Sequence, residues 1–125
     1  MKTKKILIVE DDSILQKTLQ EFLSTEGFET TSASDGEKAV ELARSGKPDL
    51  ILLDIILPKK DGYEVIKDLK SDQGTRSIPI ILLTNLGSMH DVEKALNLGA
   101  TTYLVKADYK LEEVVAKIKE VLSIN

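Results

Sequence analysis

The chain has 125 residues, of which 42% are hydrophobic and 30% charged, with 17 basic against 21 acidic residues and a formal net charge of -4. This length is typical of one domain with one core, and the apolar content argues against disorder. The composition excludes a basic nucleic-acid-binding stripe, disulfides and thiolate metal sites, while a single histidine, His90, excludes a multi-histidine metal centre.

The N-terminus is basic over residues 1–5, but the apolar stretch that follows covers only Ile6–Val9. A signal peptide needs a longer apolar region, and a membrane span needs about 20 residues. We therefore expect a soluble, cytoplasmic protein that does not contact a membrane.

Five short apolar or β-rich runs predict strands. In chain order they are Lys5–Val9, Glu29–Ala33, Leu50–Leu53, Ile78–Leu83 and Thr101–Val105. Amphipathic stretches separate them; the first has its apolar stripe at Leu15, Leu19, Phe22 and Leu23, and the last at Leu111, Val114, Val115, Ile118 and Leu122. Such alternation predicts one α/β domain over residues 1–125, with a parallel sheet covered by helices on both faces.

Several residue patterns predict where helices begin and end. The segments 34–37 and 88–91 each have a serine N-cap followed three residues later by an acid, and Asp61 can open a third helix in the same way. A C-terminal glycine is expected after three helical stretches, at Gly27, Gly46 and Gly99. The second strand is the least apolar, so we place it at an edge of the sheet.

Carboxylates follow two of the predicted strands. Asp54 ends the run Leu50–Leu53, and Glu10 and Asp11 follow the first strand. Parallel strands bring their carboxyl ends to one edge, where open α/β sheets place their ligand crevice. Three crowded carboxylates repel one another and need a cation, and such oxygen ligands suit Mg²⁺. An acidic helix start favoured by the helix dipole is the alternative, above all for Asp12, the predicted N-cap.

A hydroxyl and an amine follow two further strands, at Thr84 and Lys106. Taken singly, Thr84 is typical of a turn or cap, and Lys106 of a solvated strand end. Taken with the carboxylates, they form a set suited to phosphoryl transfer onto an aspartate. Asp54 is then the nucleophile, and no separate base is needed because a carboxylate is ionised at neutral pH.

Four segments carry a resemblance to a known family: residues 6–12, 49–62, 78–84 and 99–106. In these segments, and over essentially its whole length, the chain resembles the receiver domains of two-component response regulators. The resemblance implies a flavodoxin-like, doubly wound (βα)5 fold with a five-stranded parallel sheet in the order 2-1-3-4-5.

The resemblance also implies a phosphorelay function. Asp54 would accept a phosphoryl group from a sensor histidine kinase or a histidine phosphotransfer protein. Asp11 and Asp54 would bind Mg²⁺ directly, together with the backbone carbonyl of Ile55, and Glu10 would act mostly through water. The protein would not be an enzyme beyond catalysing its own phosphorylation and slow dephosphorylation.

Further roles follow from the same resemblance. Thr84 and Lys106 would contact the phosphoryl oxygens, and Tyr103 would turn inward as a switch when Thr84 moves. The alternative for Tyr103 is a half-buried aromatic on an edge strand. Output would come from a downstream protein that binds the face of the fourth helix, fifth strand and fifth helix, with no direct contact to nucleic acid.

The chain departs from the family pattern in a few positions. Ala107 stands where a proline usually follows the lysine, and Asn85 stands where many members have a small residue. Ile56 and Leu86 are apolar where polar groups are common. Our hypothesis is that this apolar rim hinders the hydrolytic water and prolongs the aspartyl phosphate.

Other functions compete with this interpretation. A phosphatase working through an aspartyl phosphate commonly has a second aspartate two positions after the nucleophile, where this chain has Ile56. A flavodoxin-like cofactor binder would want a glycine-rich phosphate loop after the first strand, where residues 10–12 are acidic. A receiver-like scaffold that no longer accepts phosphate is a further alternative. Only residues 123–125 follow the last helix, so we expect a stand-alone receiver, but the receiver part of a longer transcriptional regulator would have the same sequence.

Overall fold

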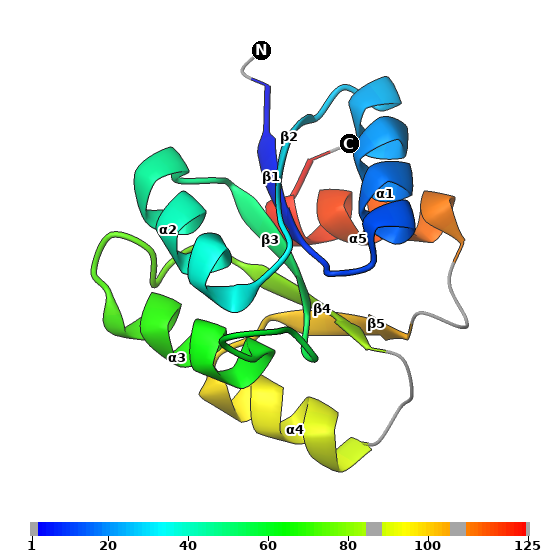
Figure 1. The fold of residues 1–125 in the computed structure, drawn as a ribbon. Coiled ribbons are helices and arrows are strands. Elements are labelled where there is room, and N and C mark those ends of the chain that lie inside the picture. The colour runs from blue at the N-terminus through cyan, green and yellow to red at the C-terminus, as the bar shows by residue number, and fades with distance from the viewer. Residues whose placement is uncertain (1–2, 85–88, 106–109, 125) are drawn as a thin grey trace.

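Strands and helices alternate along the whole chain in the computed structural model, which describes residues 3–84, 89–105 and 110–124 (Figure 1). The strands are β1 (Lys5–Val9), β2 (Glu29–Ala33), β3 (Leu50–Asp54), β4 (Ile80–Thr84) and β5 (Thr102–Val105). The helices are α1 (Ser13–Thr25), α2 (Gly36–Gly46), α3 (Gly62–Ser71), α4 (Met89–Leu98) and α5 (Leu111–Leu122). No helix in these ranges is both long and apolar enough to span a bilayer.

The five strands form one parallel sheet in the order β2-β1-β3-β4-β5. This arrangement confirms the flavodoxin-like (βα)5 fold, and β2 lies at an edge as predicted. The predicted fourth strand was too long at its start: it begins at Ile80 instead of Ile78. Pro79 has no N–H to donate to a neighbouring strand, which limits where the ladder can begin.

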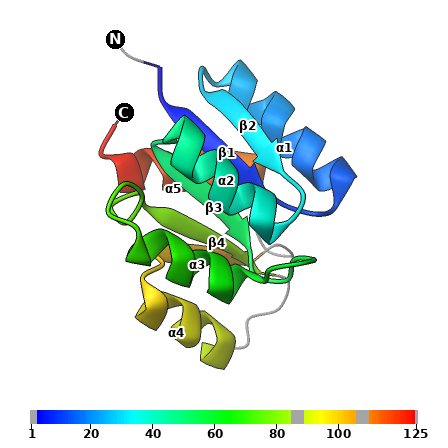
Figure 2. The same cartoon turned by 60° about the vertical axis from the view of Figure 1, so that its left-hand side comes forward.

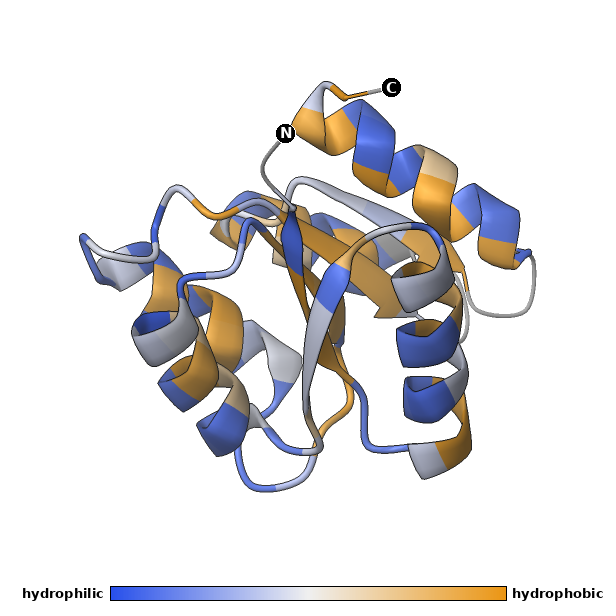
Figure 3. Ribbon diagram, turned by 90° about the horizontal axis from the view of Figure 1, so that it is seen from above, coloured by the Kyte–Doolittle hydropathy of each residue, from blue (hydrophilic) through white to orange (hydrophobic). Residues whose placement is uncertain are grey.

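Helices cover both faces of the sheet. α1 and α5 lie on one face, and α2, α3 and α4 on the other, as both views show (Figures 1 and 2). Every residue of β3 and β4 is buried, and the strands are the most apolar part of the interior (Figure 3). A charged side chain inside these strands would be buried without water, so ionisable groups are confined to their ends.

Three aspartates cap the first three helices. Asp12 and Asp61 do so as predicted: Asp12 accepts hydrogen bonds from the backbone N–H groups of the first turn of α1, and Asp61 from Glu64 N. The predicted N-cap Ser34 is wrong, because α2 begins at Gly36 and Asp35 caps it by accepting from Lys38 N at 2.8 Å. The predicted N-cap Ser88 lies outside the described residues.

Two of the three predicted C-terminal glycines are confirmed. Gly27 and Gly99 follow α1 and α4 with φ of 93° and 124°, a region that favours glycine. The prediction for Gly46 is wrong: it is the last residue of α2, and Lys47 adopts the left-handed conformation with φ of 44°. The position of a glycine near the helix end therefore did not identify the residue that adopts the left-handed conformation.

Shortening a side chain in the middle of β3 should destabilise the fold without touching its surface. Leu52 is fully buried, so we expect Leu52→Ala to lower the free energy of unfolding by about 2–5 kcal/mol through lost burial and a residual cavity. Ile14→Ala is the control, because Ile14 is 78% exposed and its removal should change stability by less than about 0.5 kcal/mol. Urea unfolding followed by circular dichroism measures both; equal losses would contradict the assignment of β3 to the core.

Candidate functional site

The register of the sheet brings three acidic side chains together at the carboxyl ends of β1 and β3. Val9 lies opposite Leu53, so the residues that follow them, Glu10 and Asp54, are neighbours. Glu10 is 1% exposed and Asp54 6% exposed, whereas Asp11 is exposed to solvent. One carboxylate oxygen from each of the three residues lies within 4.8 Å of the others. We call Glu10, Asp11 and Asp54 the acidic cluster.

Backbone amides hold the two buried carboxylates in place. Asp12 N donates to Glu10 Oε2 at 3.1 Å, and Ile56 N donates to Asp54 Oδ1 at 3.1 Å. Each bond joins a carboxylate to the amide two residues further along, so the donor comes from the loop that follows the strand. Both carboxylates are therefore oriented by the loop that follows their own strand.

Gln16 was not singled out in the sequence, yet it links the loops that follow β1 and β2. Its Nε2 lies 2.9 Å from Glu10 O, 3.2 Å from Ala33 O and 3.3 Å from Ser34 Oγ, and donates to them. A glutamine in the first turns of a helix carries no sequence signal for such a role. Only the packing of α1 against β2 shows that Gln16 fixes the backbone at Glu10.

Thr84 and Tyr103 lie on the same face of the sheet. Asp54 pairs with Leu83, so Thr84 is one residue beyond it on the adjacent strand, and Thr84 is 7% exposed. Tyr103 pairs with Leu82 and packs in the same core cluster, on the face covered by α2, α3 and α4. Because side chains alternate along a strand, Thr84 points to the same face as Leu82. Tyr103 is half-buried on edge strand β5.

Part of the predicted set lies outside the described residues. This holds for Lys106 and Ala107 after β5, and for Asn85 and Leu86 after β4. The last described residue of β5, Val105, pairs with Thr84. The roles predicted for these four positions stay predictions.

The carbonyl of Ile55 is already engaged in a hydrogen bond. Gly62 N donates to Ile55 O at 2.7 Å, and a Cβ at Gly62 would lie 2.6 Å from Ile55 Cα. The next residue, Ile56, lines the cavity at the acidic cluster and is 72% exposed. The metal role of the Ile55 carbonyl stays a prediction.

A shallow cavity of about 590 Å³ opens over the acidic cluster. Its lining includes Ile14 from α1 and Ile56 from the loop after β3; both are exposed large hydrophobic residues. Two carboxylate charges 4.8 Å apart, the upper limit for the oxygens of the acidic cluster, repel each other by about 3.5 kcal/mol at an effective dielectric constant of 20. A divalent cation offsets this repulsion, and a cluster of hard oxygen ligands with room for water suits Mg²⁺.

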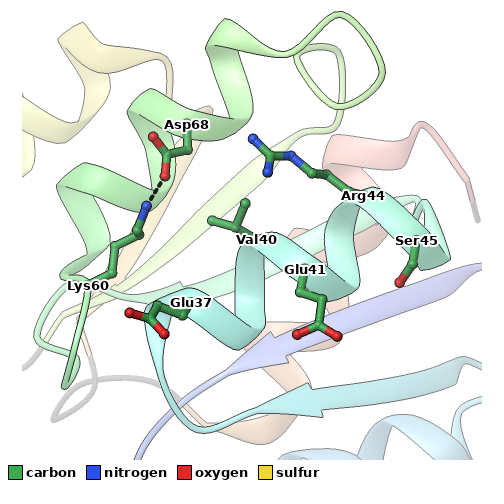
Figure 4. Close-up of a pocket in the computed structure, with 7 residues that line it drawn as sticks. All are labelled: Glu37, Val40, Glu41, Arg44, Ser45, Lys60 and Asp68. Atoms are coloured by element: carbon green, nitrogen blue, oxygen red, sulfur yellow. Dashed lines mark hydrogen bonds and ion pairs between the residues drawn. The ribbon is translucent and has the colours of Figure 1, made fainter.

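A second depression, of about 500 Å³, lies between α2 and α3 and away from the acidic cluster (Figure 4). Two of its polar groups pair with each other: Lys60 donates to Asp68, and this hydrogen bond raises the pKa of Lys60. Arg44 Nε donates to Asp72 Oδ2 at 2.9 Å, just outside the depression. Val40 lies between Lys60 and Arg44 (Figure 4). The depression is a polar contact region between two packed helices, and its lining contains none of the predicted site residues.

Comparisons with known proteins agree on one family. The family model described as the response regulator receiver domain matches residues 6–119. Among curated proteins, the chain is 42% identical over 119 residues to the probable transcriptional regulator ycf27 of Guillardia theta, which covers 95% of this chain and 45% of that protein. The chain spans about half the length of the curated relatives that it matches.

Solved structures give the same result at the level of the fold. A putative response regulator from Chloroflexus aurantiacus superimposes with a TM-score of 0.91 at 31% identity, covering 98% of this chain and 99% of that one. The receiver domain of a sensor histidine kinase from Pseudomonas aeruginosa gives 0.89 at 31% identity, with the same coverage of 98% and 99%. That structure holds a magnesium ion coordinated in its active-site cleft.

Removing one charge from the acidic cluster should stabilise the protein in the absence of divalent cations. We expect Asp11→Asn to raise the free energy of unfolding by about 1 kcal/mol, which is the repulsion energy between two such charges in water-like surroundings. The same change should weaken the stabilisation that added MgCl₂ gives, because a cation that binds the folded state stabilises it. Thermal unfolding with and without MgCl₂ measures both effects.

Asp12→Asn is the matched control for this experiment. It removes a negative charge from the adjacent residue, while asparagine caps α1 as well as aspartate does. Its response to MgCl₂ should equal that of the wild type. The same response in Asp11→Asn would show that Asp11 does not belong to a cation site.

Proposed function

The chain belongs to the response regulator receiver family, and we propose that it accepts a phosphoryl group on Asp54 in a Mg²⁺-dependent reaction and thereby switches the binding of a partner protein. Receivers are signalling proteins and not classical enzymes. The observation that carries the proposal is the acidic cluster, which joins buried Asp54 to Glu10 and Asp11 at the carboxyl edge of the sheet.

The residues of the acidic cluster fit a magnesium ion. They offer carboxylate oxygens from two strand ends, beside an open cavity with room for water ligands. Asp11 and Asp54 would bind the ion directly, the backbone carbonyl of Ile55 would add a ligand, and Glu10 would act mostly through water. When bound, the ion neutralises charge on the oxygens of the transferred phosphoryl group.

The proposal gives Asp54 the role of nucleophile. A carboxylate oxygen of Asp54 forms a bond to phosphorus while the bond from phosphorus to the imidazole nitrogen of a phosphohistidine breaks, and the electron pair of that bond stays with the imidazole. Ile56 N holds Asp54 Oδ1, which fixes the orientation of the carboxylate before the reaction. The donor is a sensor histidine kinase or a histidine phosphotransfer protein.

Thr84 and Lys106 would bind the remaining phosphoryl oxygens. The register supports this role for Thr84, because Thr84 lies one residue past Leu83, which pairs with Asp54. Thr84 shares a face of the sheet with Tyr103, so a movement of Thr84 toward the phosphate would vacate space on the side where Tyr103 packs. The signal would reach a downstream protein through the α4-β5-α5 face.

The central chemistry is tested by one reaction. Incubation with Mg²⁺ and a small phosphodonor such as acetyl phosphate should add one phosphoryl group to the wild type, and intact-mass analysis detects it. Asp54→Asn should gain nothing, because an amide oxygen is a poor nucleophile. Chelation of the metal should also prevent the mass gain in the wild type. A scaffold that no longer takes phosphate would leave all three samples unmodified.

The apolar rim beside Asp54 should set the lifetime of the phosphorylated state. Ile56 is exposed and lines the cavity, so its side chain can exclude the hydrolytic water. Replacing Ile56 with Asn, alone and together with Leu86→Glu, should speed the decay of the aspartyl phosphate, followed by intact mass after removal of the donor. Ile14→Asn changes the other exposed isoleucine of the cavity wall and should leave the decay rate unchanged. An unaltered decay rate in the Ile56 variants would contradict the hypothesis that the apolar rim hinders the hydrolytic water.

A further inference from the structure

The segment that joins Asp54 to α3, residues 55–61, is here called the acceptor loop. Its ends are fixed by short contacts. At the start, Ile56 N donates to Asp54 Oδ1, and Gly62 N donates to Ile55 O. Further along, Lys60 N donates to Pro58 O at 2.7 Å, which makes a compact turn. The turn is therefore part of the same short segment as the amide that holds Asp54.

The turn of the acceptor loop packs against the first residue of α2. Gly36 is buried, and its N–H donates to Pro58 O at 3.4 Å. A Cβ built on Gly36 would overlap the carbonyl oxygen of Lys60 and would lie 2.7 Å from its carbonyl carbon. The contacted atoms are the Lys60 carbonyl group and its Cβ, so they cannot be moved aside by a change of rotamer. A side chain at Gly36 would have to displace the turn itself.

Two ion pairs flank this contact without replacing it. Lys59 Nζ lies 3.7 Å from Asp35 Oδ2, with the Lys59 side chain 63% exposed, and Lys59 has φ of 67°. Lys60 crosses to Asp68 on α3, close to the first turn of α2 (Figure 4). The Lys59–Asp35 pair is largely exposed on its lysine side, and such pairs contribute little and are screened by salt. The Lys60–Asp68 pair is only partly exposed, but it joins the turn to α3 and not to α2. The close approach of Gly36 is therefore the contact that fixes how near the turn lies to α2.

We infer that Gly36 is a positioning residue for the chemistry at Asp54: its lack of a side chain seats the acceptor loop so that Ile56 N reaches the Asp54 carboxylate. The inference rests on the proposed function, since it assigns Gly36 a part in the Mg²⁺ and phosphoryl chemistry of that site. Gly36 touches none of the reacting groups and acts through Pro58 and Lys60. It comes from the β2–α2 junction, whereas Asp54 ends β3.

The variant that tests this inference is Gly36→Ala, with Gly46→Ala as its matched control. Gly46 lies in the same helix, and a Cβ there meets no atom within 4 Å. Calorimetric titration with Mg²⁺, at a temperature where circular dichroism shows each variant folded, should give an affinity about 10-fold weaker for Gly36→Ala, as outer-shell changes around a metal typically do. Gly46→Ala should bind like the wild type. Equal affinities for both variants would overturn the inference.

A measurement on the wild type alone covers the case in which Gly36→Ala does not fold. Coupling between two sites is reciprocal, so if the Gly36 contact favours Mg²⁺ binding, then Mg²⁺ must strengthen that contact. Hydrogen exchange of the Gly36 amide, which bonds to Pro58 O, should slow when Mg²⁺ is added, while the Gly46 amide should not respond. An unchanged Gly36 exchange rate in protein that binds Mg²⁺ would refute the role of Gly36. Wild type that takes up no Mg²⁺ would refute the proposed function itself.

Discussion

The burial of the central strands is the constraint on which the site depends. β3 and β4 are covered on both faces, and β1 is buried beyond its first residue, so none of these strands can carry an ionisable side chain except at an end. All five strands run in parallel, and their carboxyl ends therefore meet at one edge. Glu10 and Asp54 are held there beside each other despite their mutual repulsion, which a divalent cation would offset.

The site is built from loops, but each loop is held by a neighbouring element. Gln16 on α1 fixes the backbone at Glu10, and the amide of Ile56 orients Asp54. Gly62 and Gly36 allow α3 and α2 to approach the acceptor loop more closely than a side chain would permit. This support explains how a cluster of like charges can be kept in a fixed geometry on the surface of a small domain. Thr84 and Tyr103 lie on the face of the sheet that α2, α3 and α4 cover, which connects the carboxyl edge of the sheet to the side of α4.

Local patterns in the sequence predicted most of the fold, and their failures have local causes. The apolar runs located the strands to within about two residues, and Asp12 and Asp61 were recognised as caps. Ser34 and Asp35 are both suitable N-cap residues, and the local sequence does not show which of them precedes the first helical residue. Asp35 does so, because α2 begins at Gly36, which packs against the acceptor loop. Gly46 failed in the same way, because Lys47 ends α2 by adopting the left-handed conformation.

The sequence by itself determined the chemistry available to this protein. Buried strands followed by acids at Glu10, Asp11 and Asp54 and by a hydroxyl at Thr84 are enough to predict a cation-binding edge, since burial and charge act over a few adjacent residues. The tertiary structure decided which groups support that edge. Gln16, Gly36 and Gly62 act through contacts with residues far away in the chain or through a missing side chain, and neither kind of contact leaves a periodic or local mark in the sequence.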